Sequence, residues 1–147
     1  MDTMTNEIHT YGGYNVGCML GTAYQTLVAE LSESLSKAGL DVTAAEYLVL
    51  RTLYDKDGMQ QCDIAALLGK DKATISRCVR NMESKGLVTT ELVSYKCLKV
   101  YASEKARRIE PAIMAVAAAR HDALTELLTR HEMETFVNVL KKIISNH

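Results

Sequence analysis

The feature that most constrains the fold is a pair of short helical segments separated by a glycine in the middle of the chain. Gln61–Leu68 has apolar residues at helical spacing and is followed at once by Gly69, which can take the left-handed conformation that stops a helix. The next segment, Asp71–Lys85, opens with a residue type that caps helices. The spacing of Ala65, Gly69 and Ile75 suits a close approach of two helices, a turn with positive φ and an apolar anchor. These residues predict two short helices joined by a tight turn.

A β-hairpin is predicted directly after this pair of helices. Leu87–Thr90 and Leu98–Tyr101 are short runs rich in β-branched residues, joined by a loop at about Glu91 to Cys97. Two short helices followed directly by a hairpin form a winged helix-turn-helix. The predicted fold class is therefore mostly α (α+β), a winged helix-turn-helix with a small β-hairpin wing and long N- and C-terminal dimerisation helices.

Longer helical patterns flank the central segment on both sides. Thr43 and Glu46 have the spacing of a capping box, which marks the start of a helix that is closed by Asp57-Gly58. Pro111 interrupts a long alanine-rich pattern and predicts either a kink or a place in the first turn of that helix. The flanking helices are predicted over Asn15–Lys37, Thr43–Tyr54, Ser103–Thr129 and Glu132–Ser145.

The length of the chain fits one domain with a single core, and 1–147 is predicted to be one domain. Within it, residues 43–102 form the winged helix-turn-helix, and residues 15–38 and 103–146 form the dimerisation helices. The apolar stripes near both chain ends need burial that a compact winged helix leaves incomplete. We therefore expect a homodimer.

Positive charge is concentrated in one continuous stretch, although the net charge of the whole chain is −1. Residues 70–108 hold ten Lys and Arg against four Asp and Glu, a balance of +6, whereas the remainder holds seven against fourteen, a balance of −7. Such an asymmetry is expected when one face of a protein meets a polyanion. A basic segment that merely balances acidic flanks is the equally weighted alternative.

The segment Asp71–Lys85 has two distinct faces. Its apolar residues recur at steps of three and four, so they share one side and are predicted to pack inward. The other side presents Arg77 and Arg80 among small and polar residues, which suits contact with bases and phosphates in a DNA groove. A solvated surface is the alternative for an isolated helix, and the helix-turn-helix context favours DNA. The inward stripe is Ile75, Cys78, Val79 and Met82, and the residues predicted to bind DNA are Gln61, Lys70, Lys72, Ala73, Thr74, Ser76, Arg77, Arg80, Asn81 and Lys96.

The stretch from Asp63 to Val88 resembles the core of the MarR family of bacterial regulators. Family members usually show a leucine-rich helix, a glycine turn, a T-x-S-R element, here Thr74 to Arg77, and an exit into the wing like Lys85-Gly86-Leu87-Val88. The likeness extends over nearly the whole chain, because such proteins build their dimer from a helix before the motif and two long helices after it. The resemblance implies a transcription factor, usually a repressor, that binds a palindromic operator in double-stranded DNA as a homodimer.

The wing departs from the family pattern. Family wings commonly carry an acidic-arginine element whose arginine enters the minor groove, whereas the loop Glu91–Lys96 is shorter and contains no arginine. Lys96 is the only cation at its tip, and Tyr95 beside it is a candidate for stabilising the hairpin. The helix over Asp71–Lys85 is therefore expected to supply most of the specificity.

The resemblance also implies a response to a small ligand or an oxidant. MarR-like proteins often hold an aromatic or phenolic ligand between the dimer helices and the winged domain, and Tyr24, Tyr47, Tyr54 and His121 are the candidates to line such a site. Cys18 lies roughly where hydroperoxide-sensing relatives place a reactive cysteine. A buried structural thiol is the favoured alternative for Cys18, because no cation lies near it in the sequence.

Other classes of protein receive no support from the sequence. The histidines make no metal-binding pattern, the cysteines are too far apart for CxxC pairs, and no phosphate loop or nucleophile elbow is present. No apolar run approaches the roughly 20 residues of a membrane span. We expect a cytoplasmic, non-enzymatic protein without a cofactor. The predicted function is a sequence-specific DNA-binding transcription regulator, a repressor released by a small ligand or oxidant; the alternative is a winged-helix protein-interaction module without operator binding.

Overall fold

The computed structural model describes residues 11–146. Helices make up most of the described part of the chain, and three short strands form one antiparallel sheet in the order β1-β3-β2. The elements are α2 (Val16–Lys37), α3 (Ala44–Asp55), β1 (Met59–Gln60), α4 (Gln61–Leu68), α5 (Lys72–Ser84), β2 (Val88–Ser94), β3 (Cys97–Ala102), α6 (Glu104–Thr125) and α7 (Arg130–Ser145).

Local sequence signals set the ends of several helices, as predicted. Thr43 and Glu46 form a capping box at the start of α3, in which each side chain accepts a hydrogen bond from the other residue's amide. Gly69 ends α4 with a φ of 64°, the left-handed conformation that the tight turn requires. Ser103 caps α6 by accepting a hydrogen bond from the Ala106 amide.

One hydrophobic core joins α3, α4, α5 and the sheet. The predicted inward stripe of α5 is confirmed, because Ile75, Val79 and Met82 are buried and Cys78 is half-buried. β1 pairs with the middle of β3 and so connects the start of α4 to the sheet. Two long helices reach the same core, α2 through Leu35 and α6 through Ala106 and Ile113. The other fully buried large residues are Leu50, Leu53, Ile64, Leu87, Val49, Val88 and Val100.

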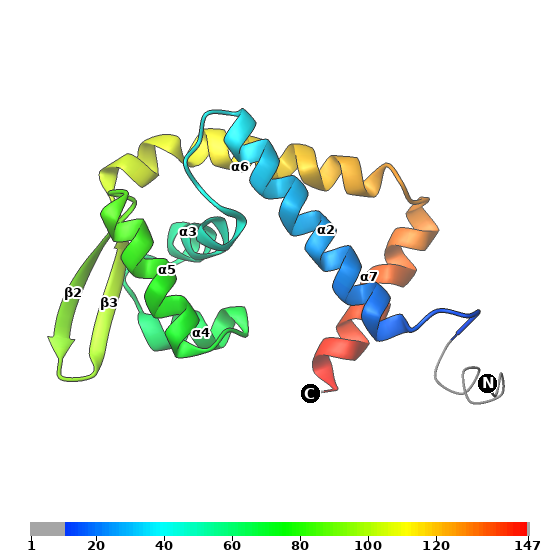
Figure 1. The fold of residues 1–147 in the computed structure, drawn as a ribbon, viewed down its shortest axis with the longest axis horizontal. Coiled ribbons are helices and arrows are strands. Elements are labelled where there is room, and N and C mark those ends of the chain that lie inside the picture. Colours follow the sequence, from blue (N-terminus) through cyan, green and yellow to red (C-terminus); the bar gives the residue numbers. More distant parts are fainter. Residues whose placement is uncertain (1–10, 147) are drawn as a thin grey trace.

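The long helices form an open frame beside this winged unit (Figure 1). α6 runs from the hairpin past the winged unit to the far end of the molecule, where the chain turns into α7 (Figure 1). An ion pair of 2.7 Å between Arg120 of α6 and Glu30 of α2 connects the two helices. No residue of α7 is buried within the described part of the chain, although its apolar residues recur at helical spacing. Large exposed apolar side chains gather on this frame: Tyr14, Val16, Met19, Leu20, Tyr24 and Leu27 of or next to α2, and Phe136, Val137, Val139, Ile143 and Ile144 of α7.

The structure differs from the predicted elements at the end of α6, at the hairpin loop and at β1, and it excludes one of the two roles predicted for Pro111. α6 ends at Thr125 rather than near Thr129, because Thr129 and Glu132 form a second capping box that starts α7 at Arg130. Pro111 is the eighth residue of α6, beyond the first turn. The predicted hairpin loop is mostly strand, since pairing continues to Ser94 and Cys97. β1 was not predicted.

Candidate nucleic-acid interface

The N-terminus of α5 is fixed by Asp71, as the sequence predicts. The Asp71 carboxylate accepts hydrogen bonds from the Thr74 amide at 2.7 Å and from the Thr74 hydroxyl at 2.9 Å. These hydrogen bonds lower the pKa of the exposed Asp71 carboxyl below its usual value. The cap is therefore charged at neutral pH and holds the first turn of α5, which carries Ala73 and Thr74, in helical geometry.

The outward face of α5 carries two arginines that have no acidic partner in residues 11–146. Arg77 and Arg80 are both exposed, and each guanidinium lies 3.4 Å from a hydroxyl one turn earlier in the helix, Arg77 from Thr74 and Arg80 from Ser76. Neither guanidinium forms a salt bridge with a described residue. Long contacts to neutral hydroxyls are weak, so both cations are available to a phosphate or a base.

Other basic residues of the same stretch have structural partners. Lys85 at the end of α5 binds Glu46 of α3 at 2.8 Å, and Glu46 is 3% exposed. The hydrogen bond from Lys85 to Glu46 is the main reason why the pKa of Lys85 is raised. Arg107 of α6 binds Asp57 at 2.6 Å. The positive charge of residues 70–108 thus divides into cations that hold the fold together and cations that face solvent.

The remaining predicted DNA-binding residues lie on both sides of α5. Gln61, Lys72 and Lys96 line one small cleft of about 140 Å³, between the start of α4, the start of α5 and the hairpin turn. Lys70 lies apart from them, with its Nζ 5.8 Å from the centre of the Tyr24 ring in α2. The outward residues Ala73 and Asn81 are exposed, and Thr74 and Ser76 are half-buried.

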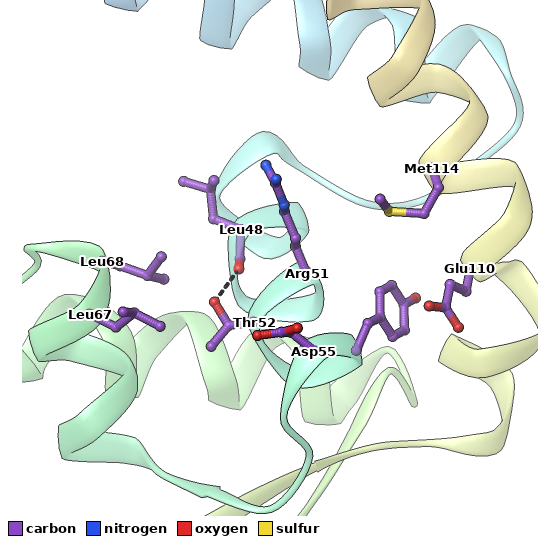
Figure 2. Close-up of a pocket in the computed structure, with 9 residues that line it drawn as sticks. Leu48, Arg51, Thr52, Asp55, Leu67, Leu68, Glu110 and Met114 are labelled. Carbon is purple, nitrogen blue, oxygen red and sulfur yellow. Dashed lines mark hydrogen bonds between the residues drawn. The ribbon is translucent and has the colours of Figure 1, made fainter. Parts of the chain in front are cut away.

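A larger cleft lies between α3, the end of α4 and α6, and has a volume of about 600 Å³. Glu110 and Met114 project into it from α6, opposite Arg51 and Asp55 of α3 (Figure 2). Of the four residues predicted to line a ligand site, Tyr54 lies in this cleft. Its remaining lining residues are Leu48, Thr52, Leu67 and Leu68.

Tyr54 connects the cleft to the start of α6. Its hydroxyl donates a hydrogen bond of 2.6 Å to the carbonyl of Ala106. Burial and then the nearby Glu110 carboxylate raise the pKa of Tyr54 to about 12, so the phenol stays protonated and donates at physiological pH.

The other predicted ligand residues do not gather at this cleft. Tyr47 is buried in the core, whereas Tyr24 and His121 are exposed on the long helices. Leu48, Arg51 and Asp55 were not predicted, although their steps of three and four residues place them on one side of α3, next to the core-facing side.

The cysteines lie in different environments. Cys18 is exposed in the first turn of α2, and its amide donates to the capping residue Asn15. The prediction of a buried thiol at Cys18 is therefore wrong for the single chain, because the frame of long helices leaves that end of α2 open. Burial raises the pKa of the half-buried Cys78 thiol. Cys97 is half-buried and Cys62 is exposed.

Neither a metal cluster nor a membrane span is found in residues 11–146. No group of three or more His, Cys, Asp or Glu side chains there could hold a metal ion. No helix of that part of the chain is long and apolar enough to cross a membrane. Two of the histidines, His9 and His147, lie outside the described residues.

Known proteins match this fold and its central segment. A sequence model of the MarR family matches residues 42–91. The HTH-type transcriptional regulator YybA of Bacillus subtilis is 23% identical over 125 residues, which cover 82% of this chain and 83% of YybA. Among solved structures, the S. aureus MepR-DNA complex matches with a TM-score of 0.82 at 21% identity, over 90% of this chain and 98% of that one. CouR from Rhodococcus jostii RHA1, bound to p-coumaroyl-CoA, matches with a TM-score of 0.72 at 23% identity, over 87% of this chain and 90% of that one.

The winged helix-turn-helix architecture and these matches together define the class of the protein. Over residues 42–91 the chain matches the MarR family, and its fold is that of the winged-helix regulators of this family. The resemblance stated from the sequence motif is confirmed.

Proposed function

We propose that the protein is a transcription regulator that binds specific double-stranded DNA through the outward face of α5. The observation that carries this proposal is the pair of exposed guanidiniums, Arg77 and Arg80, which have no carboxylate partner in residues 11–146. Arginine in a helix of this kind can form a bidentate contact with guanine or bind a phosphate. Relatives of similar fold include a protein solved in complex with DNA, which supports the same use of the fold.

The same proposal assigns different roles to different parts of the chain. Residues 43–102 read DNA, and residues 15–38 and 103–146 bring two copies together. The exposed apolar side chains of α2 and α7 support a homodimer, because such a surface is unfavourable in water. Two copies related by a twofold axis would present two α5 helices to successive major grooves about one helical turn apart, which matches a palindromic operator.

Replacing Arg77 tests the proposed interface directly. We expect Arg77→Ala to weaken binding by on the order of 1–3 kcal/mol if the guanidinium contacts guanine, with relaxed preference at one base position per half-site. If Arg77 binds phosphate instead, affinity should fall for all sequences, and the salt slope should shrink by about one unit for each phosphate that is no longer bound. The measurement is a salt titration on a duplex that the wild-type protein selects from a random pool, beside a scrambled duplex.

The matched control removes the same charge elsewhere. Arg130 on α7 is exposed and pairs with its neighbour Glu134, so Arg130→Ala should bind like wild type. Melting curves check that each variant is folded. If folded Arg77→Ala keeps the affinity and the salt slope of wild type, the outward face of α5 is not the DNA-binding surface. Failure of the wild type to select any duplex would favour a protein-interaction module.

A regulatory site is favoured by the 600 Å³ cleft between α3 and α6. It joins the proposed DNA-reading unit to the proposed dimer helices, so a ligand that fills it would change their relative position. We propose that a small aromatic ligand binds there and lowers DNA affinity, as a repressor released by its ligand requires. CouR, of similar fold, is solved with p-coumaroyl-CoA, which supports a ligand-responsive use of the fold.

A ligand screen with a blocked cleft tests this regulation. We expect at least one compound from a panel of phenols and aromatic acids to raise the melting temperature and weaken DNA binding. Met114→Trp should abolish both effects, because the larger side chain fills the cleft. In parallel, Cys18→Ser is compared with wild type under peroxide. If no compound and no oxidant changes DNA affinity, the protein does not respond to either class of signal.

A further inference from the structure

The cleft between α3, the end of α4 and α6 has two carboxylates that no cation neutralises within residues 11–146. Glu110 of α6 is half-buried and Asp55 of α3 is exposed, and neither forms a salt bridge with a described residue. A half-buried carboxylate without a partner loses part of its hydration without compensation. The cleft therefore complements a positive charge.

Two hydroxyl groups of the cleft have already donated their protons. The Tyr54 hydroxyl donates to the carbonyl of Ala106 at 2.6 Å. The Thr52 hydroxyl donates to the carbonyl of Leu48 at 2.9 Å (Figure 2). A hydroxyl whose proton is donated in this way can only accept further hydrogen bonds. Both hydroxyls therefore add acceptors to those of the two carboxylates.

Arg51 is the only cation among the described residues that line the cleft, and its side chain points elsewhere. Figure 2 shows it extending away from Asp55 and from Glu110. Arg51 is exposed, so water solvates its guanidinium. A ligand group beside Glu110 thus meets hydrogen-bond acceptors and a negative charge.

The other end of the cleft is apolar. Leu67 and Leu68 project from the end of α4, on the side opposite Glu110 (Figure 2). Leu67 is 65% exposed, so an apolar group that covers it removes apolar surface from water. Met114 of α6 adds a thioether, which makes favourable contacts with aromatic rings. The cleft therefore suits a ligand with one cationic end and one apolar end.

We infer that the regulatory ligand is an amphiphilic amine, whose ammonium group binds Glu110 and whose aromatic ring packs against the two leucines at the end of α4. This inference rests on the regulatory site proposed above and names the chemical class of its ligand. An ammonium group has three donors and no acceptor, so it matches a site made of acceptors. An aromatic acid would instead bring a third carboxylate close to two others, and like charges repel.

A panel of matched compounds tests the charge of the ligand. Benzyl, phenethyl and naphthylmethyl scaffolds are each supplied as a primary amine, an alcohol and a carboxylic acid. At neutral pH, the best amine should raise the melting temperature of the full-length chain and weaken its binding to the selected duplex. This amine should bind at least about tenfold more tightly than the alcohol and the acid of the same scaffold, the size of one hydrogen bond to a charged group.

Two variants separate the charge of Glu110 from the shape of the cleft. Glu110→Gln keeps the size of the side chain and removes its charge, so the amine should lose about tenfold in affinity and the alcohol less than about twofold. Glu126→Gln is the matched control, because Glu126 is exposed at the end of α6, outside the cleft, and should leave both affinities unchanged. Melting curves without ligand check that both variants are folded.

The outcomes distinguish this inference from the proposed regulatory site. If the acids bind more tightly than the amines and weaken DNA binding, the site is regulatory but its ligand is not an amine. If folded Glu110→Gln binds the amine as tightly as wild type does, the ammonium group does not bind Glu110, and the inference is wrong. If no compound of any charge binds, or if Met114→Trp leaves binding unchanged, the proposed regulatory site is wrong, and this inference with it.

Discussion

Phe136→Glu should convert the protein from a dimer into a monomer at micromolar concentration and abolish tight binding to a palindromic duplex. Phe136 lies on the apolar stripe of α7, a helix with no buried residue in the described part of the chain. A carboxylate on that stripe would have to be buried without a partner in the dimer, at a cost of several kcal/mol. Separate protomers would bind half-sites independently, without the gain in affinity that comes from linking two binding events.

The measurements are sedimentation for the mass and a titration with the selected duplex for affinity. Asn138→Glu is the matched control, because Asn138 is exposed on the opposite side of α7 and should leave both properties unchanged. A dimeric Phe136→Glu protein would show that α7 is not part of the interface. A monomeric wild type would contradict the dimer itself.

Glu46→Ala should have the largest effect of any single charge removal on stability, lowering the free energy of unfolding by about 2–3 kcal/mol. Breaking a buried ion pair by removing one partner costs roughly 3–5 kcal/mol. We expect a smaller loss here because the Lys85 side chain is 25% exposed. The substitution also removes the hydrogen bond to the Thr43 amide, so the cap of α3 is weakened. The measurement is urea unfolding followed by circular dichroism.

The difference in the free energy of unfolding between wild type and Glu46→Ala should depend on pH, and the pKa of Lys85 sets the sign of that dependence. The folded-state pKa of Lys85 is raised above its ordinary value of 10.5, so the pair stabilises the protein fully below that pH. The stabilisation disappears as pH rises through the folded pKa. The free energies of unfolding of wild type and Glu46→Ala should therefore become more similar in strongly alkaline solution.

Asp41→Ala is the control for Glu46→Ala. Asp41 also contacts Lys85, at 3.3 Å, but its side chain is exposed, so its removal should change stability by less than about 1 kcal/mol. Equal effects of the two substitutions would show that burial of Glu46 does not decide the strength of the pair.

Elements with a local cause were predictable from the sequence, and those with a non-local cause were not. The capping box of Thr43 and the glycine turn after α4 depend on residues close in the chain, and both are present. β1 is very short and exists because it pairs with β3, which lies far along the chain. Pairing between β2 and β3 likewise extends the hairpin to Ser94 without a turn glycine. The capping box at Thr129 also depends on neighbouring residues. It was missed because the alanine-rich pattern before it concealed the end of α6 at Thr125.

The candidate interface was more predictable than the candidate ligand cleft. The stripe of α5 follows from helical periodicity, so Arg77 and Arg80 could be assigned to the outward face. The 600 Å³ cleft depends on how α6 lies against α3, which brings Glu110 to the same cleft as Arg51 and Asp55. The resemblance to the MarR family pointed to Tyr24, Tyr47, Tyr54 and His121, and a resemblance carries no information about how α6 packs against α3 in this chain.

α6 connects the winged unit to α7, so a tilt at the start of this helix displaces its far end. α6 begins one residue after the hairpin. Its start is anchored by the ion pair between Arg107 and Asp57 and by the hydrogen bond from the Tyr54 hydroxyl to the Ala106 carbonyl. A helix of 22 residues is about 33 Å long, so a tilt of about 10° at the anchor displaces its far end by about 6 Å. Pro111 lacks the amide that would bond to the carbonyl one turn earlier, which makes the helix most compliant just beyond its anchor. If two copies pair through the long helices as proposed, small changes in packing beside α3 would change the spacing between them.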